Sequence, residues 1–252
     1  MSTNVTTLSN GLTIASHAMD HLETVSLGVW VASGARHETP KQHGLSHLLE
    51  HMAFKGTAKR SAQRIAEEIE DIGGDLNAAT GLDMTAYYAR VLKGDDGVAL
   101  NILADILLNS SFNVQELDKE REVIQQEIAA AQDSPDALVF DLVQQAAFPG
   151  QAIGRPILGT QDSVGALQAA DLRAFLGARY TPQSMVVSAA GAIDHEKLVR
   201  HVEALFGGLT RGQAGAEVSA RYVGGVAASS KLFEQSHVVI GFPAPSYLED
   251  DF

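Results

Sequence analysis

The 252-residue sequence contains no cysteine, so no disulfide can form, and the chain is compatible with a reducing compartment. It also contains no apolar run long enough to span a membrane. The N-terminus, Met-Ser-Thr-Asn-Val, lacks the basic-then-apolar pattern of a signal peptide and the arginines of a transit segment. These absences predict a soluble, cytoplasmic protein.

Basic residues are few: 18 Lys and Arg stand against 31 Asp and Glu, which gives a net charge of −13. Such a balance disfavours nucleic acid and anionic membrane surfaces as partners. Hydrophobic residues make up 45% of the chain, and low-complexity stretches are few. We therefore expect a globular protein with a sizeable core, built as one large domain or as a domain with an extension.

The most informative pattern is His47-Leu-Leu-Glu50-His51. Two histidines four residues apart on a helix project from one side, one turn apart, and can bind the same metal ion. Glu50 shares their face, while the opposite face is apolar and can pack against a core: Leu45, Leu48, Leu49 and Met52. The order His-x-x-Glu-His inverts the commoner zinc-peptidase motif. The alternative is a surface helix with two ordinary histidines.

A catalytic zinc needs a third protein ligand, and the segment 116–127 offers candidates. It has neither Pro nor Gly and predicts a helix, with Asn113 as its cap. Glu120 and Glu127 are seven residues apart and so share one face, which is partly apolar. A carboxylate on such a face needs a partner. The alternative is a solvated glutamate on a charged helix.

Strand-like and helix-like segments alternate along the chain, beginning with a hairpin at Asn10-Gly11. Strands are expected near 5–8, 12–18, 25–32, 75–79, 84–92, 185–190 and 236–242. Helices are expected near 44–54, 61–72, 96–109, 115–132, 136–147, 162–178 and 194–206. The pattern predicts an α+β fold, with a mostly antiparallel sheet packed by helices on one face.

The run Gly44–Thr57, followed by Glu127 at 127 − 51 = 76 residues after His51, resembles the pitrilysin family. That family includes insulin-degrading enzyme, the mitochondrial processing peptidase and bacterial relatives. The resemblance extends over roughly residues 4 to 210, with further matches at Gly34–Glu38, Gly73–Thr80, Gly154–Gly159 and Tyr180–Pro182.

The resemblance implies one zinc per chain, with His47, His51 and Glu127 as ligands and Glu50 as the catalytic base. Glu120 matches an acid that orients a ligand histidine through its ring N–H, although a structural hydrogen bond would also explain it. The resemblance further implies a sheet edge on which an extended peptide adds as a strand, formed by Asn77, Ala78, Ala79 and Thr80. Such binding uses main-chain hydrogen bonds and tolerates many sequences.

The resemblance also implies a division into residues 1–210, a catalytic zinc-binding half-domain, residues 211–230, a linker rich in Gly, Ala and Ser, and residues 231–252, the truncated start of a similar half. The expected function is a zinc endopeptidase acting on oligopeptides or unfolded polypeptide, completed by a second half in cis or in trans, including as a dimer. Two alternatives stay open. One is an inactive fragment or non-catalytic subunit, and the other is a structural metal module, which would need a fourth ligand.

Overall fold

The computed structural model describes residues 3–212 and 219–246, and its centre is one six-stranded sheet. The strand order is β1-β2-β6-β3-β5-β4, and every neighbouring pair is antiparallel except β2 and β6. The strands are β1 (Thr3–Thr7), β2 (Thr13–Ala18), β3 (Thr24–Val31), β4 (Asp75–Thr80), β5 (Thr85–Leu92) and β6 (Met185–Gly191). The predicted hairpin at Asn10-Gly11 joins β1 to β2, and β4 forms one edge of the sheet.

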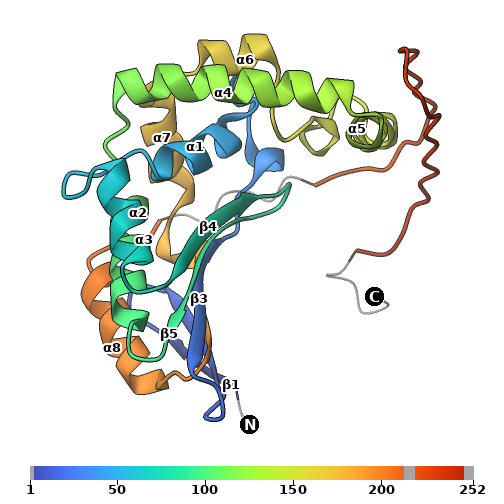
Figure 1. The fold of residues 1–252 in the computed structure, drawn as a ribbon. Coiled ribbons are helices and arrows are strands. Elements are labelled where there is room, and N and C mark those ends of the chain that lie inside the picture. Colours follow the sequence, from blue (N-terminus) through green and yellow to red (C-terminus); the bar gives the residue numbers. More distant parts are fainter. Residues whose placement is uncertain (1–2, 213–218, 247–252) are drawn as a thin grey trace.

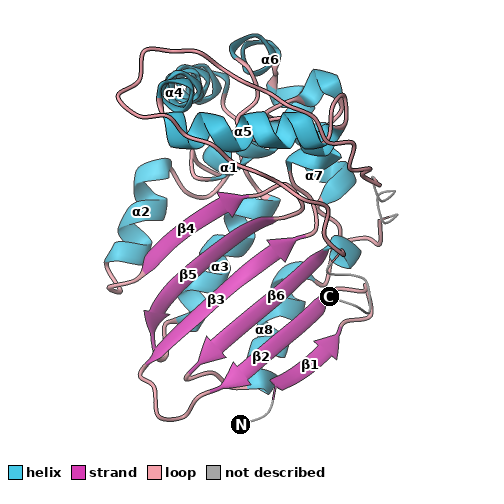
Figure 2. Cartoon of the chain, turned by 90° about the vertical axis from the view of Figure 1, so that its right-hand side faces the viewer, coloured by secondary structure: helices cyan, strands magenta, loops and turns pink. Residues whose placement is uncertain are grey.

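Helices cover one face of the sheet and gather at one of its ends (Figures 1 and 2). α3 and α8 lie behind the sheet in Figure 2, whereas α1, α4, α5, α6 and α7 form the layer above it. Their bounds are α1 Leu45–Ala53, α2 Ala62–Glu70, α3 Asp96–Leu108, α4 Val114–Asp133, α5 Pro135–Ala147, α6 Gln161–Ala166, α7 Ala169–Arg179 and α8 His195–Phe206. The predicted α+β class is confirmed. No helix of the described chain is both long and apolar enough to cross a membrane.

The core lies between the sheet and α3. Along β3 every second side chain is buried, as the two-residue period of a strand requires: Val25, Leu27, Val29 and Val31. α3 is apolar around most of its circumference, and its Leu100, Ile102, Leu103 and Ile106 are at most 1% exposed. A helix of this composition needs apolar neighbours on several sides, which explains its central place.

The helix predicted over 162–178 is two helices, α6 and α7, separated at Leu167 and Gln168. Leu167 is extended, with φ −62° and ψ 140°, and its carbonyl accepts a hydrogen bond from Arg121 of α4. No proline lies at the break, although Gly165 comes two residues before it, and Arg121 of α4 satisfies the Leu167 carbonyl that the end of α6 leaves free.

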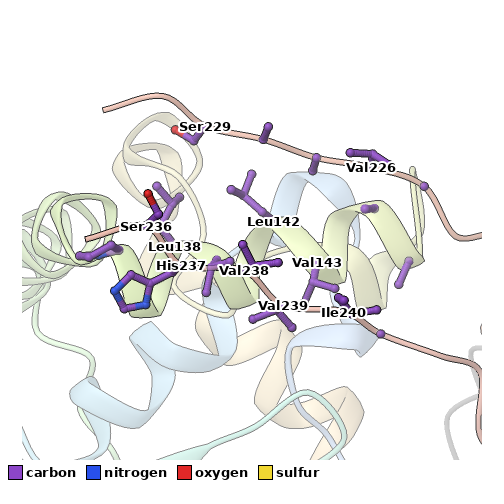
Figure 3. A pocket seen from close by; sticks show the side chains of 18 of the residues that line it. Leu138, Leu142, Val143, Val226, Ser229, Ser236, His237, Val238, Val239 and Ile240 are labelled. Atoms are coloured by element: carbon purple, nitrogen blue, oxygen red, sulfur yellow. The ribbon is translucent and has the colours of Figure 1, made fainter. Parts of the chain in front are cut away.

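Residues 219–246 form neither helix nor strand, so the strand predicted over 236–242 is wrong. No neighbouring strand pairs with this segment in the described part of the chain. It runs beside α5 instead, where the Val223 N–H donates to the Ala147 carbonyl at 2.8 Å. A trough of about 620 Å³ lies between them, and Figure 3 shows Leu138, Leu142 and Val143 of α5 facing Val238, Val239 and Ile240.

Candidate metal centre

The two histidines of the motif project from one side of α1. Gly44 precedes the helix in the left-handed conformation, with φ 89°, and the helix begins at Leu45. The His47 and His51 rings lie 4.6 Å apart between centroids, at an interplanar angle of 64°. The apolar residues of the motif are buried on the other side, where they anchor the helix: Leu45, Leu48, Leu49 and Met52.

α4 crosses α1 and brings Glu127 to the histidines (Figure 1). Asn113 caps α4 as expected, because its side chain accepts from the N–H groups of Gln115 and Glu116. A buried stripe then follows at helical spacing: Leu117, Glu120, Ile124 and Ile128. Glu127 lies beside this stripe, and its Oε2 is 3.8 Å from Nε2 of both His47 and His51.

The three side chains fit a metal ion. Glu127 Oε2 is buried and has no hydrogen-bond partner among the described residues, although two ring nitrogens face it. One ligand atom from each of His47, His51 and Glu127 lies within 4.8 Å of the others, the one such cluster in the described chain. Two ligands at about 2.1 Å from a tetrahedral zinc are about 3.4 Å apart, close to the 3.8 Å seen here. Two imidazoles with one carboxylate are a ligand set of catalytic zinc sites.

The surroundings of His47 lower the pKa of its imidazole and so favour the uncharged form. Burial, and after it the neighbouring His51, lowers the pKa of His47 to about 4. The imidazole is therefore neutral near pH 7 and keeps a free lone pair, which is the form that binds a metal.

Glu120 holds His51 from the side away from Glu127. Its Oε2 lies 3.0 Å from His51 Nδ1, and since an ionised carboxylate accepts only, Nδ1 is the donor. The lone pair of His51 then belongs to Nε2, which faces Glu127. The second oxygen, Oε1, receives Lys55 Nζ at 2.8 Å, so this buried carboxylate has a partner on each side. Lys55 was not predicted from the sequence, although it follows His51 by four residues, just beyond the end of α1 at Ala53.

Replacing Glu120 with Gln is expected to weaken zinc affinity by about 10- to 100-fold, because the amide removes the charge that fixes the His51 ring. Lys55→Met should act in the same direction with a smaller effect, since Glu120 keeps one partner. Competition with a chromophoric chelator measures both. Glu116→Gln, which alters a Lys119 pair nearer the start of α4, is the matched control and should bind like wild type. Wild-type affinity in the Glu120 variant would contradict the orienting role.

Glu50 lies on α1 between the histidines but is not part of the three-residue cluster. Its Oε2 is buried without a hydrogen-bond partner in the described structure. Together with their burial, the charge of Glu50 raises the pKa of two tyrosines, Tyr87 and Tyr180, whose hydroxyls are 3.1 Å apart. Burial, together with the Glu50 charge, raises the pKa of Tyr180 to about 12, so the hydroxyl stays protonated. No local sequence pattern linked these tyrosines to Glu50.

The strand expected to receive substrate ends beside the metal helix. β4 is the edge of the sheet and carries Asn77, Ala78, Ala79 and Thr80. Thr80 Oγ1 donates to the Ser46 carbonyl at 3.4 Å, one residue before His47. The Asn77 amide oxygen accepts from the Ala78 N–H at 2.8 Å, so this side chain lies along its own strand.

Comparisons with known proteins concern the family and the fold of this chain. A sequence model described as Insulinase (Peptidase family M16) matches residues 13–161, and one described as Peptidase M16 inactive domain matches residues 166–252. An uncharacterized zinc protease of Rickettsia bellii is 42% identical over 245 residues, which are 97% of this chain and 60% of the relative. The mitochondrial-processing peptidase subunit beta of Dictyostelium discoideum is 43% identical over 86% of this chain and 46% of its own length.

Among solved structures, a protease from Helicobacter pylori superposes with a TM-score of 0.83 at 22% identity, over 88% of this chain and 54% of that chain. At this identity the similarity concerns the fold. The boundary between the two family matches, near residue 165, does not divide the sheet, because β6 pairs with both β2 and β3. The chain spans 60% of the length of the Rickettsia relative.

Proposed function

Because this chain belongs to the insulinase family of peptidases (family M16), we propose that it carries the zinc site of a metalloendopeptidase. The observation that carries the proposal is the convergence of His47, His51 and Glu127 from two helices on one point. The proposed reaction is hydrolysis of peptide bonds in oligopeptides or extended polypeptide segments. Two relatives, one described as a zinc protease and the other as a processing peptidase subunit, support the same reaction class.

The proposed roles follow from chemistry and position. A zinc ion held by the three ligands would supply a Lewis acid and would lower the pKa of a water to about 7. Glu50, on the same helix but outside the ligand cluster, takes the proton of the attacking water and returns it to the leaving amine. Glu120 keeps the His51 ring in one orientation and one tautomer.

The proposed substrate is an extended peptide that adds to the free edge of β4. Main-chain hydrogen bonds along such an edge give affinity with little dependence on side chains. The small side chains of Ala78 and Ala79 allow a close approach, and the contact from Thr80 to Ser46 holds the end of this edge near the metal helix. Asn77 would contribute once its amide turns from its own strand to the peptide.

The proposed partner is a second, similar half, in cis or in trans, that covers the peptide and excludes water. Support comes from the relatives, of which this chain spans 60% and 46%. An alternative proposal is a non-catalytic subunit of such an assembly. The presence of all four motif residues, His47, Glu50, His51 and Glu127, argues against it.

We expect residues 1–252 to bind about one zinc per chain and to cleave peptides far more slowly alone than with the second half. Turnover of one fluorogenic peptide is compared at equal zinc occupancy, before and after the proposed second half is supplied in cis or in trans. Equal rates would contradict the two-half proposal. A zinc-loaded assembly that hydrolyses no peptide would contradict the peptidase itself.

A further inference from the structure

The first turn of α1, which carries His47, has no local cap. Gly44 holds the cap position in the left-handed conformation and has no side chain to accept from the free N–H groups that begin the helix. A Cβ at Gly44 would lie 2.7 Å from the Leu158 carbonyl oxygen and 3.0 Å from Gly159 Cα. A capping Ser, Thr, Asp or Asn therefore cannot replace this glycine, and the helix start needs an acceptor from elsewhere.

Glu38 supplies that acceptor from six residues upstream. Its Oε2 receives the Gly44 N–H at 2.8 Å, and its Oε1 receives the Ser46 N–H at 2.6 Å. Both carboxylate oxygens are thus bound to the backbone of the first turn. The second bond reaches the residue directly before His47, and the carbonyl of the same residue accepts from Thr80 of the edge strand.

Glu38 is itself held firmly. It is 4% exposed, and its carbonyl accepts from an Arg155 guanidinium nitrogen while its N–H donates to the Ala35 carbonyl. His43 Nε2 lies 2.8 Å from the Pro156 carbonyl, which fixes the loop between Glu38 and the helix. These contacts hold both the backbone of Glu38 and the loop that follows it, so the carboxylate has a fixed position.

Burial without compensation would make an ionised Glu38 costly. Burial raises the pKa of Glu38 to about 7, and the two backbone N–H groups and the charge of Arg155 oppose that rise. A buried acid at a helix start is also favoured by the positive end of the helix dipole. A carboxylate offers one acceptor oxygen to each of the two N–H groups, which the single oxygen of a glutamine amide cannot do.

We propose that Glu38 is a positioning residue of the metal centre, which fixes the first turn of α1 so that the His47 and His51 nitrogens face Glu127. The inference rests on the proposed zinc site. Glu38 touches neither the ligands nor the substrate edge, and it acts through the peptide groups of Gly44 and Ser46. No motif of the sequence assigned it this task.

The test compares Glu38→Gln and Glu38→Ala with wild type in the full protein. Glutamine keeps the shape but offers one acceptor oxygen, so one of the two N–H groups would face an amide NH₂. We expect zinc affinity, measured by chelator competition well below the unfolding temperature, to fall by about 10-fold in both variants. The visible spectrum of the cobalt-substituted protein should change, because ligand geometry changes. Turnover should fall on the order of 10²-fold with KM little altered.

Asp96→Asn is the matched control, because Asp96 is another buried acid in the first turn of a helix, α3, where it pairs with Lys197 of α8. It should lower the unfolding temperature while leaving zinc affinity and the cobalt spectrum as in wild type. The inference is overturned if the folded Glu38 variants bind metal like wild type, or if Asp96→Asn weakens zinc equally. Zinc affinity and the cobalt spectrum need no turnover, so these readouts decide the role of Glu38 even if the protein proves not to be a peptidase.

Discussion

Replacing Glu50 with glutamine is expected to reduce peptide hydrolysis by about 10²- to 10⁴-fold while zinc remains bound. The amide cannot take a proton from water, which is the task proposed for Glu50. It has almost the same shape as the acid, so α1 and the ligands on it should keep their places. The effect should appear in turnover at full zinc occupancy, with the metal content of each preparation measured beside the rate.

The structure makes this separation of roles testable. Glu50 lies outside the cluster formed by His47, His51 and Glu127, and its Oε2 is buried without a partner in the described chain. Glu70→Gln removes an exposed acid from the neighbouring helix α2 and serves as the matched control, which should behave as wild type in both measurements. Loss of zinc from the Glu50 variant would make Glu50 a ligand and overturn the assignment.

The elements that the sequence predicts well are those with a strong periodic pattern. α1 and α4 follow from apolar spacing and from the Asn113 cap, and β3 follows from its alternation of buried and exposed residues. The meeting of α1 with α4 was implied by the resemblance and by the demand of a catalytic zinc for a third ligand. Sequence spacing alone could not predict this contact, because residues 51 and 127 are far apart in the sequence and only the tertiary structure brings them together.

The features that were missed depend on distant contacts. Glu38 accepts a hydrogen bond from the N–H of Gly44, the left-handed residue that precedes α1. Lys55 lies beyond the end of α1 and pairs with Glu120 of α4. The break at Leu167 is stabilised by Arg121 of another helix. Residues 236–242 have the composition of a strand, yet a strand exists only with a pairing neighbour, which no local pattern reports.

Removing any one proposed ligand is expected to abolish zinc binding at micromolar metal and, with it, hydrolysis. The loss in affinity for His47→Ala, His51→Ala or Glu127→Ala should exceed the roughly 10- to 100-fold that an outer partner of a ligand contributes. Metal content after dialysis against a weak chelator gives the result directly. Glu122→Ala, an exposed acid five residues before Glu127 on the same helix, and His21→Ala, an exposed histidine in a turn, should retain wild-type zinc.

Glu127 provides the sharpest form of this test, because it was assigned by resemblance and lies on a different helix from the histidines. Its Oε2 is 3.8 Å from both ring nitrogens, so its removal opens one side of the centre without disturbing α1. Since ligands act as a unit, the double variant His47→Ala/Glu127→Ala should lose no more activity than either single variant. Full zinc occupancy in Glu127→Ala would place the third ligand elsewhere. If the losses of activity in the two single variants multiplied in the double variant, the two residues would act independently rather than on one metal ion.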